Sequence, residues 1–222
     1  MNLLAIDTAA DACSVGVVTG SGVPVLRTEV IGRGHAETLM GMVVAAMTEA
    51  GLGYAALDRI AVTVGPGSFT GLRVGIAAAR GLALVHGIET VGIGVLAVHA
   101  STVGFASGRP VLALLAAGRG EVYGQRFRAD GQEDGPPRVA SPQVFAAEVV
   151  DGMALAGSGA DLVIAALPMT QRPPVLHRNT APDIAALCRL ALVAPKPAGP
   201  PKPLYLRAPD AKPQAAMQIP RR

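Results

Sequence analysis

The order of apolar patterns in the first 94 residues constrains the fold of this chain more than any other feature. Three short apolar runs separated by turn residues predict a three-stranded meander. Two helical patterns then follow, and each is succeeded by another apolar run, so the predicted order is βββαβαβ. We expect strands at 3–6, 14–18, 23–30, 60–64 and 90–93, and helices at 36–50 and 71–86. This alternation favours an α/β fold.

The second half of the chain repeats such patterns less regularly. We expect strands at 111–115, 121–128 and 154–157, and a helix near 183–193. Eight of the 18 prolines then fall in the last 28 residues, which predicts an extended or disordered stretch. Its apolar island at 203–207 is expected to dock on the body. The predicted domains are an N-terminal lobe at 1–100, a smaller C-terminal lobe at 101–194 and a Pro-rich basic tail at 195–222.

Charge is divided unevenly between the body and this tail. The tail holds six basic residues and Asp210, which leaves 13 basic and 15 acidic residues before it, a net charge of −2. A body of that sign has no general attraction for phosphates. The few aromatic residues do not cluster with basic ones, so no platform for stacking single-stranded bases is expected. Any direct contact with nucleic acid would need charge from the tail or from a partner.

The sequence shows no sign of export or of a membrane span. Cys13 and Cys188 lie far apart, and the first residues carry Asp7 inside an apolar stretch that no basic segment precedes. Charged residues interrupt the apolar run at 74–98, which is therefore too short to cross a bilayer. We expect a reduced, cytoplasmic protein with no structural disulfide and no contact with a membrane.

The strongest local motif is GPGSFTGLR at 65–73, where a strand turns into a helix that Thr70 is expected to cap. Glycines and a helix N-terminus suit a phosphate, which makes Gly65, Gly67 and Ser68 candidates for a phosphate loop. The alternative is a tight turn that lets a glycine-rich helix pack closely. No lysine precedes Lys196, which excludes a P-loop, Schiff-base or kinase-type lysine from the folded part.

Asp7 and Thr8, at the end of the first strand, are the second candidate phosphate or metal site. The alternative there is a turn in which the aspartate caps backbone amides. The four histidines have no metal-ligand spacing, and neither serine nor cysteine occurs in a hydrolase signature. We therefore expect no catalytic residue, no metal site and no cofactor in this chain.

The helices at 36–50 and 71–86 are apolar over more of their circumference than one sheet covers. Either the second lobe covers the remainder or another subunit does, since methionine adapts to a partner and small residues allow close approach. The candidate interface residues are Leu39, Met40, Val43, Met47, Leu72, Arg73, Ile76 and Arg80.

Four motifs, in this order, resemble those of the bacterial TsaB (YeaZ) family. They are IDTA at 6–9, GPGSFTGLR at 65–73, GEVY at 120–123 and YLR at 205–207. The resemblance spans nearly the whole chain, and the middle motif is its most specific part. It implies a two-lobed actin/Hsp70/sugar-kinase-like (ASKHA) fold, with mixed sheets flanked by helices. It also implies a non-catalytic scaffold or activator subunit in the formation of N6-threonylcarbamoyladenosine in tRNA.

The same resemblance implies the partners. They are a TsaD-like catalytic subunit, which carries metal-binding histidines that this chain lacks, a TsaE-like ATPase, tRNA reached through the complex, and a second copy of the chain as a homodimer. The chain departs from the family at 116–119, where Ala-Ala-Gly-Arg replaces an Asp-Ala-Arg motif and weakens a charged site between the lobes. The alternative functions are a free-standing phosphotransferase or ATPase built on Asp7, Thr8 and the Gly65 loop, and a glycoprotease, for which metal ligands are absent.

Overall fold

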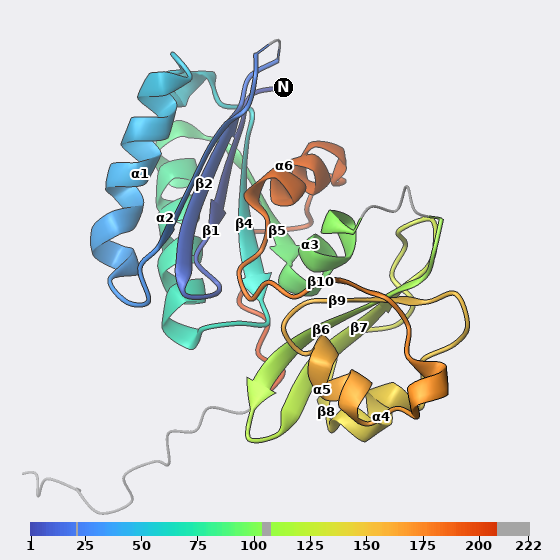
Figure 1. Cartoon of the computed structure of the whole chain (residues 1–222). Coiled ribbons are helices and arrows are strands. Elements are labelled where there is room, and N and C mark those ends of the chain that lie inside the picture. The colour runs from blue at the N-terminus through green and yellow to red at the C-terminus, as the bar shows by residue number, and fades with distance from the viewer. Residues whose placement is uncertain (21, 104–107, 208–222) are drawn as a thin grey trace, which may run out of the picture.

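Two five-stranded mixed sheets, each flanked by helices, form the chain (Figure 1). The structure is a computed structural model, and it describes residues 1–20, 22–103 and 108–207. The α/β class with mixed sheets, predicted from the sequence, is confirmed. Residues 208–222 of the predicted tail lie outside the described residues.

The first sheet has the strand order β3-β2-β1-β4-β5. Its strands are β1 (Leu3–Asp7), β2 (Ala12–Val18), β3 (Val25–Val30), β4 (Arg59–Gly65) and β5 (Glu89–Gly94). The first three are antiparallel neighbours, so the predicted meander is confirmed, and β4 and β5 run parallel to β1. Every residue of β1 is buried, because helices cover both faces of this sheet.

Helices α1 (His35–Glu49) and α2 (Phe69–His86) pack on one face of the first sheet, against β2 and β4. Both lie within two residues of their predicted bounds. The cap of α2 is Ser68 and not Thr70, because the helix begins at Phe69 and the Ser68 hydroxyl accepts a hydrogen bond from the amide of Gly71.

The opposite face of the first sheet carries α3 (Val95–Thr102) and α6 (Ile184–Val193). The sequence did not predict α3, which begins directly after β5 and has no side-chain cap. The second-lobe range 101–194 includes α6, yet α6 packs against β1, β2 and α3. The chain thus returns to the first lobe at its end, and we propose that α6 belongs to that lobe.

The second sheet has the order β10-β9-β6-β7-β8. Its strands are β6 (Val111–Gly118), β7 (Glu121–Phe127), β8 (Arg138–Ala140), β9 (Ala154–Ala156) and β10 (Val175–His177). Alternate residues of β6 face α3 on one side, and α4 (Pro142–Ala146) with α5 (Ala160–Ala165) on the other. Short 3-10 turns lie at Tyr54–Ala56 and Met169–Gln171. Because α3 packs against both sheets, it joins the two lobes.

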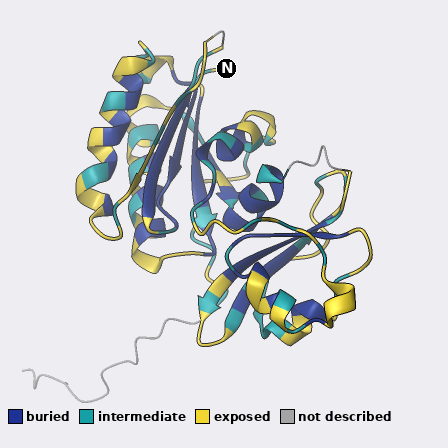
Figure 2. Cartoon of the chain, viewed as in Figure 1, coloured by how far each residue is buried: buried dark blue, intermediate teal, exposed yellow. Residues whose placement is uncertain are grey.

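Residues 195–207 run back along the first lobe. The amide of Leu204 donates a hydrogen bond to the Val64 carbonyl at 2.7 Å, and Pro201 lies against Gly92 of β5. Prolines suit this position, since they cannot extend the edge strand β5 into further pairing. Figure 2 shows that the central strands of both sheets are buried, whereas the outer side of α1 is exposed. Exposed residues of α2 include Arg73, Ala77 and Leu84. None of the helices in the described part of the chain is long and apolar enough to cross a membrane.

Candidate functional site

The loop at 65–68 joins β4 to α2 and packs on the turn that follows β1. The amide of Ser68 donates to the Ala9 carbonyl at 2.7 Å. The Thr8 hydroxyl donates to the Gly71 carbonyl, also at 2.7 Å. A Cβ at Gly71 would lie 2.0 Å from the Thr8 carbonyl oxygen, which no side chain tolerates. These contacts support the packing interpretation of the glycine-rich motif, and phosphate binding at this loop stays a prediction.

The same packing uses polar groups that a phosphate would need. The Ser68 amide is already bonded to Ala9, and its hydroxyl caps α2. A Cβ at Gly67 would lie 2.4 Å from the Ala9 carbonyl oxygen, and Gly65 has a φ of +115°. Of the five residues predicted for phosphate loops, Gly67 and Ser68 line a cleft, Gly65 is buried, and Asp7 and Thr8 are wholly buried.

Asp7 has a buried carboxylate that is only half satisfied. Its Oδ1 accepts hydrogen bonds from the Thr63 hydroxyl at 2.7 Å and from the Ala9 amide at 3.2 Å. Its Oδ2 has no hydrogen-bond partner among the described residues. Burial raises the pKa of Asp7 from 3.8 to about 6, and the two hydrogen bonds oppose that rise. In the part of the chain that the structure describes, no three His, Cys, Asp or Glu side chains gather as metal ligands would.

A cleft of about 390 Å³ lies beside this loop and is lined from both lobes. Ala116 and Ala117 line it, so the family's Asp-Ala-Arg is replaced at the cleft itself. The described residues that line it include one charged side chain, Asp11, and no lysine or arginine. Since polyphosphates are usually held by cations, the lining suits a small neutral molecule better than a nucleotide.

A pair of stacked histidines links α3 to β10, and sequence spacing gave no signal for it. His99 Nδ1 lies 3.0 Å from His177 Nε2, and the ring centroids are 4.9 Å apart. His177 Nδ1 accepts from the Asn179 amide, which places the proton of that ring on Nε2 and makes His99 Nδ1 an acceptor. Burial, with the neighbouring His177 as a smaller cause, lowers the pKa of His99 from 6.5 to about 3. The pair is neutral at physiological pH and connects the two lobes.

The two cysteines are buried free thiols. Burial raises the pKa of Cys13 to about 11 and that of Cys188 to about 12. A thiol protonated at neutral pH is a poor nucleophile. Neither cysteine has the properties of a catalytic residue.

The predicted interface residues divide into two groups. Met40, Arg73 and Arg80 are exposed on the outer sides of α1 and α2. The other five have buried side chains; Leu39, Val43, Met47 and Ile76 lie in the core of the first lobe, and Leu72 packs in the cluster of α3 and β6. The helical pattern could not tell which side of each helix faces the sheet, because the apolar arc of both is wider than one sheet covers.

The exposed apolar side chains on these helices are Met40, Val44, Phe69, Leu84 and Val85. Leu84 is 86% exposed and Val44 is 53% exposed. Met40 was predicted as an interface residue, whereas Val44, Phe69, Leu84 and Val85 were not. All five are exposed on α1 or α2, and we call them together the helix-pair surface.

Arg73 and Arg80 lie on the flank of α2. The Arg73 guanidinium stacks on the Phe69 ring at 3.7 Å from its centroid, and Nε donates to the Tyr205 hydroxyl at 2.9 Å. Both arginines line a groove of about 840 Å³ between α2 and the tail, whose far wall includes Pro200. This helix therefore presents cations next to the exposed apolar residues.

Comparisons with known proteins agree on one family. A family model described as TsaD, tRNA N6-adenosine threonylcarbamoyltransferase, matches residues 26–156. An uncharacterized protein of Mycobacterium tuberculosis is 39% identical over 219 residues, which covers 96% of this chain and 95% of that protein. The Escherichia coli tRNA threonylcarbamoyladenosine biosynthesis protein TsaB is 37% identical over 131 residues, 59% of this chain and 56% of that protein. The solved structure of YeaZ from Pseudomonas aeruginosa superposes with a TM-score of 0.72 at 32% identity, covering 86% of this chain and 90% of that one.

Proposed function

The chain belongs to the TsaB (YeaZ) family, and from this premise we propose that it takes part in forming N6-threonylcarbamoyladenosine in tRNA as a non-catalytic scaffold that activates a TsaD-like catalytic subunit. In this proposal the TsaD-like subunit binds the helix-pair surface. A TsaE-like ATPase joins the pair, tRNA is reached only through the complex, and the free chain pairs with itself through the same surface.

The observation that carries this proposal is the apolar area that the monomer leaves in water. Val44 on α1 and Leu84 on α2 are at least half exposed although each belongs to a helix with a well-packed inner side. Burying such side chains stabilises a complex by about 25 cal/mol per Å² before the costs of association. A surface of this kind in a soluble fold indicates a protein partner.

The alternative function, a free-standing phosphotransferase or ATPase, has less support. It would place phosphates against the loop at 65–68, where the Ser68 amide and hydroxyl already bond within the chain. The adjoining cleft offers Asp11 as its charged group among the described lining residues, and an acid repels a polyphosphate. We retain it as the outcome in which the purified chain alone turns over ATP and Asp7→Ala abolishes that turnover.

The test uses the purified chain and the TsaD-like subunit encoded in the same genome. We expect the two to co-elute as a complex, and adding the chain to raise threonylcarbamoyl transfer to tRNA. The double variant Met40→Asp, Val44→Asp is expected to lose both effects while keeping its thermal unfolding transition. Val150→Asp is the matched control, because Val150 is 52% exposed outside the two helices and should change neither readout. If elution and transfer by the TsaD-like subunit are unchanged when the wild-type chain is added, the proposal is wrong.

A further inference from the structure

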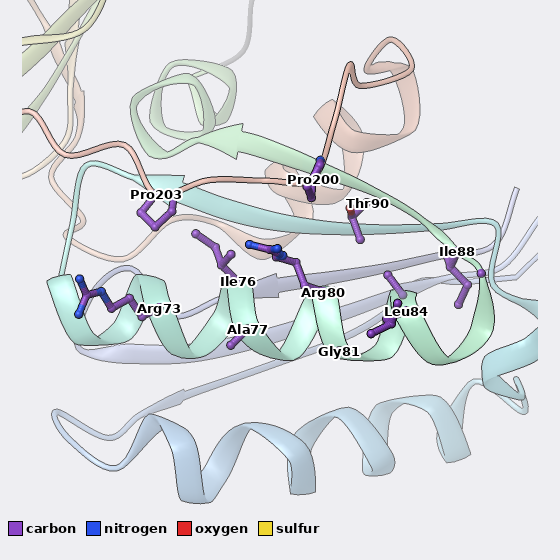
Figure 3. A pocket seen from close by; sticks show the side chains of 12 residues that line it. Arg73, Ile76, Ala77, Arg80, Gly81, Leu84, Ile88, Thr90, Pro200 and Pro203 are labelled. Atoms are coloured by element: carbon purple, nitrogen blue, oxygen red, sulfur yellow. The ribbon is translucent and has the colours of Figure 1, made fainter.

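The groove between α2 and the tail has an apolar floor and two cationic positions. Its α2 wall carries Arg73, Ala77, Arg80 and Leu84, which recur every three or four residues and so form one stripe. Pro200 and Pro203 of the tail form the opposite wall. Figure 3 shows Arg73 at one end of the groove, Leu84 and Ile88 towards the other, and Arg80 between them. The stripe from Arg73 to Leu84 is about 16 Å long at 1.5 Å per residue, or three turns of a helix.

Neither arginine in the groove has an anionic partner among the described residues. Arg80 makes no hydrogen bond or ion pair with any described residue, whereas Arg73 stacks on the Phe69 ring and donates to the Tyr205 hydroxyl. The two arginines are seven residues apart, which corresponds to about 10.5 Å along a helix. The described lining contains no acidic side chain that would satisfy them from within.

We propose that this groove binds an amphipathic helix with an acidic edge, on which two carboxylates seven residues apart pair with Arg73 and Arg80 while the apolar side chains between them cover Ala77 and Leu84. Two helices that lie side by side share the same rise, so carboxylates two turns apart match both guanidinium groups at once. Guanidinium and carboxylate form bidentate pairs, which fix the register of the bound helix. The proposal rests on the proposed function, because it identifies the segment with a part of the TsaD-like subunit.

Other occupants fit the charges less well. A second copy of the chain would offer the exposed side of α1, whose carboxylates Glu37 and Glu49 are twelve residues, or about 18 Å, apart. Glu49 is also already paired with Arg27. The chain's own residues 208–222 contain Lys212, Arg221 and Arg222 against one acid, Asp210, so they carry the same sign as the groove.

The apolar floor of the groove favours a protein occupant over RNA. Leu84, Ile88 and the two prolines offer no hydrogen-bond donor to a phosphate backbone, whereas they cover aliphatic side chains well. The described residues that line the groove include no aromatic side chain that would stack a base. A helix with mixed apolar and acidic character meets both parts of the lining.

The experiment measures the dissociation constant between the full chain and the purified TsaD-like subunit by titration calorimetry, at low and at high salt. Arg80→Glu is expected to weaken binding by about tenfold or more, and Arg80→Gln by a smaller factor, since reversal adds repulsion to the lost pair. The salt dependence of binding should also be shallower for Arg80→Glu than for the wild type. Arg172→Glu is the matched control, because Arg172 is exposed in the second lobe and should leave the constant unchanged.

The outcomes distinguish the acidic-helix proposal from the proposed function. If Arg80→Glu binds as tightly as Arg172→Glu while Met40→Asp, Val44→Asp abolishes the complex, this inference is overturned and the proposed function stands. If the wild-type chain does not bind the TsaD-like subunit at all, both are overturned. The same variants are titrated with unmodified tRNA transcript and examined by sedimentation of the chain alone. A loss confined to tRNA binding or to self-association also overturns the acidic helix as the occupant.

Discussion

The lobe junction and the helix-pair surface both hold groups without partners, but of opposite kinds. At the junction the group without a partner among the described residues is the buried Oδ2 of Asp7. In the same region Gly71 packs onto the Thr8 backbone without space for a methyl group. On the helix-pair surface the unpartnered groups are exposed apolar side chains, and Arg80 lies in the adjoining groove, unpaired within the described part of the chain. A buried polar atom without a partner lowers the stability of the monomer, whereas an exposed apolar side chain can be covered by a second molecule. We therefore expect substitutions at the junction to change folding and those on the surface to change binding.

The largest effect should come from adding a methyl group to the junction. Gly71→Ala would place a Cβ 2.0 Å from the Thr8 carbonyl oxygen and would separate α2 from the turn after β1. We expect a loss of more than about 3 kcal/mol in the free energy of unfolding, because overpacking against backbone cannot be relieved by a rotamer change. Thermal unfolding should shift down by about 10 °C.

The control for this prediction is the same substitution on α1. Gly41 is exposed, and a Cβ there would meet nothing within 4 Å. Gly41→Ala should raise the unfolding free energy by about 0.5–1 kcal/mol, since alanine loses less backbone entropy in a helix. Equal effects at the two glycines would contradict the distinction between a packed junction and an open surface.

The sequence predicted the elements of the first lobe well because their patterns are local. The meander, α1 and α2 each follow from periodicity and turn residues within about 15 positions. The short helix α3 was missed because it follows β5 with no turn residue and no capping side chain between them. The position of α6 was not predictable either, since its contacts join residues nearly the whole chain length apart.

The helices that carry the candidate site, α1 and α2, were predictable from the sequence, but the sides of these helices that face solvent were not. Periodicity alone selected Leu39 and Val43, which the sheet buries, together with Met40, which it leaves exposed. Which stripe faces inward depends on how the helix is rotated on the sheet, and an apolar arc wider than one sheet covers does not determine that rotation. The contact between His99 and His177 joins residues 78 positions apart, so only tertiary structure brings it about.

The next prediction compares the buried carboxylate of Asp7 with the exposed guanidinium of Arg80. The folded-state pKa of Asp7 is raised from 3.8 to about 6, so its contribution to stability is fully present below pH 3.8 and is lost as the pH rises through 6. Asp7→Asn removes that loss and should stabilise the chain by up to about 3 kcal/mol at pH 7.5 and much less at pH 4.5. Arg80→Gln, which removes an exposed charge, should change stability by less than about 0.5 kcal/mol at either pH.

Urea unfolding of both variants and the wild type at the two pH values measures this difference. A decrease in stability for Asp7→Asn at pH 7.5 would contradict a carboxylate that folding leaves half satisfied. It would indicate instead that the Asp7 charge meets a favourable partner at the junction.

A smaller effect of opposite sign should come from the histidine pair at the junction. The folded-state pKa of His99 lies well below 6.5, so the neutral pair stabilises the fold at neutral pH and that stability is lost as the pH falls. The expected loss is about 2 kcal/mol between pH 6.5 and 5, and burial of His177 adds to it in the same direction. In the wild type the Asp7 titration offsets this loss.

The two titrations are separable in the Asp7→Asn background. There we expect stability to fall between pH 6.5 and 5, and the further substitution His99→Gln to flatten that slope. Chemical denaturation at four pH values across this range measures it. An unchanged slope after His99→Gln would assign the acid sensitivity to a group elsewhere in the chain.

The smallest predicted change in stability comes from removing single ion pairs, one at the lobe junction and one beside α1. Arg207 pairs with Glu121 and also donates to the Ala117 carbonyl at 3.0 Å, which ties the tail to the β6–β7 hairpin of the second lobe. Arg27 and Glu49 pair in a more open position, with side chains 41% and 53% exposed. Arg207→Gln should cost about 1 kcal/mol because it also removes a charged hydrogen bond to backbone, and Arg27→Gln less than about 0.5 kcal/mol. Urea midpoints at low and high salt measure both, and the Arg27 effect should vanish in high salt because solvent screens an exposed pair. Equal costs for the two substitutions would mean that the Arg207 pair does not hold the lobes together.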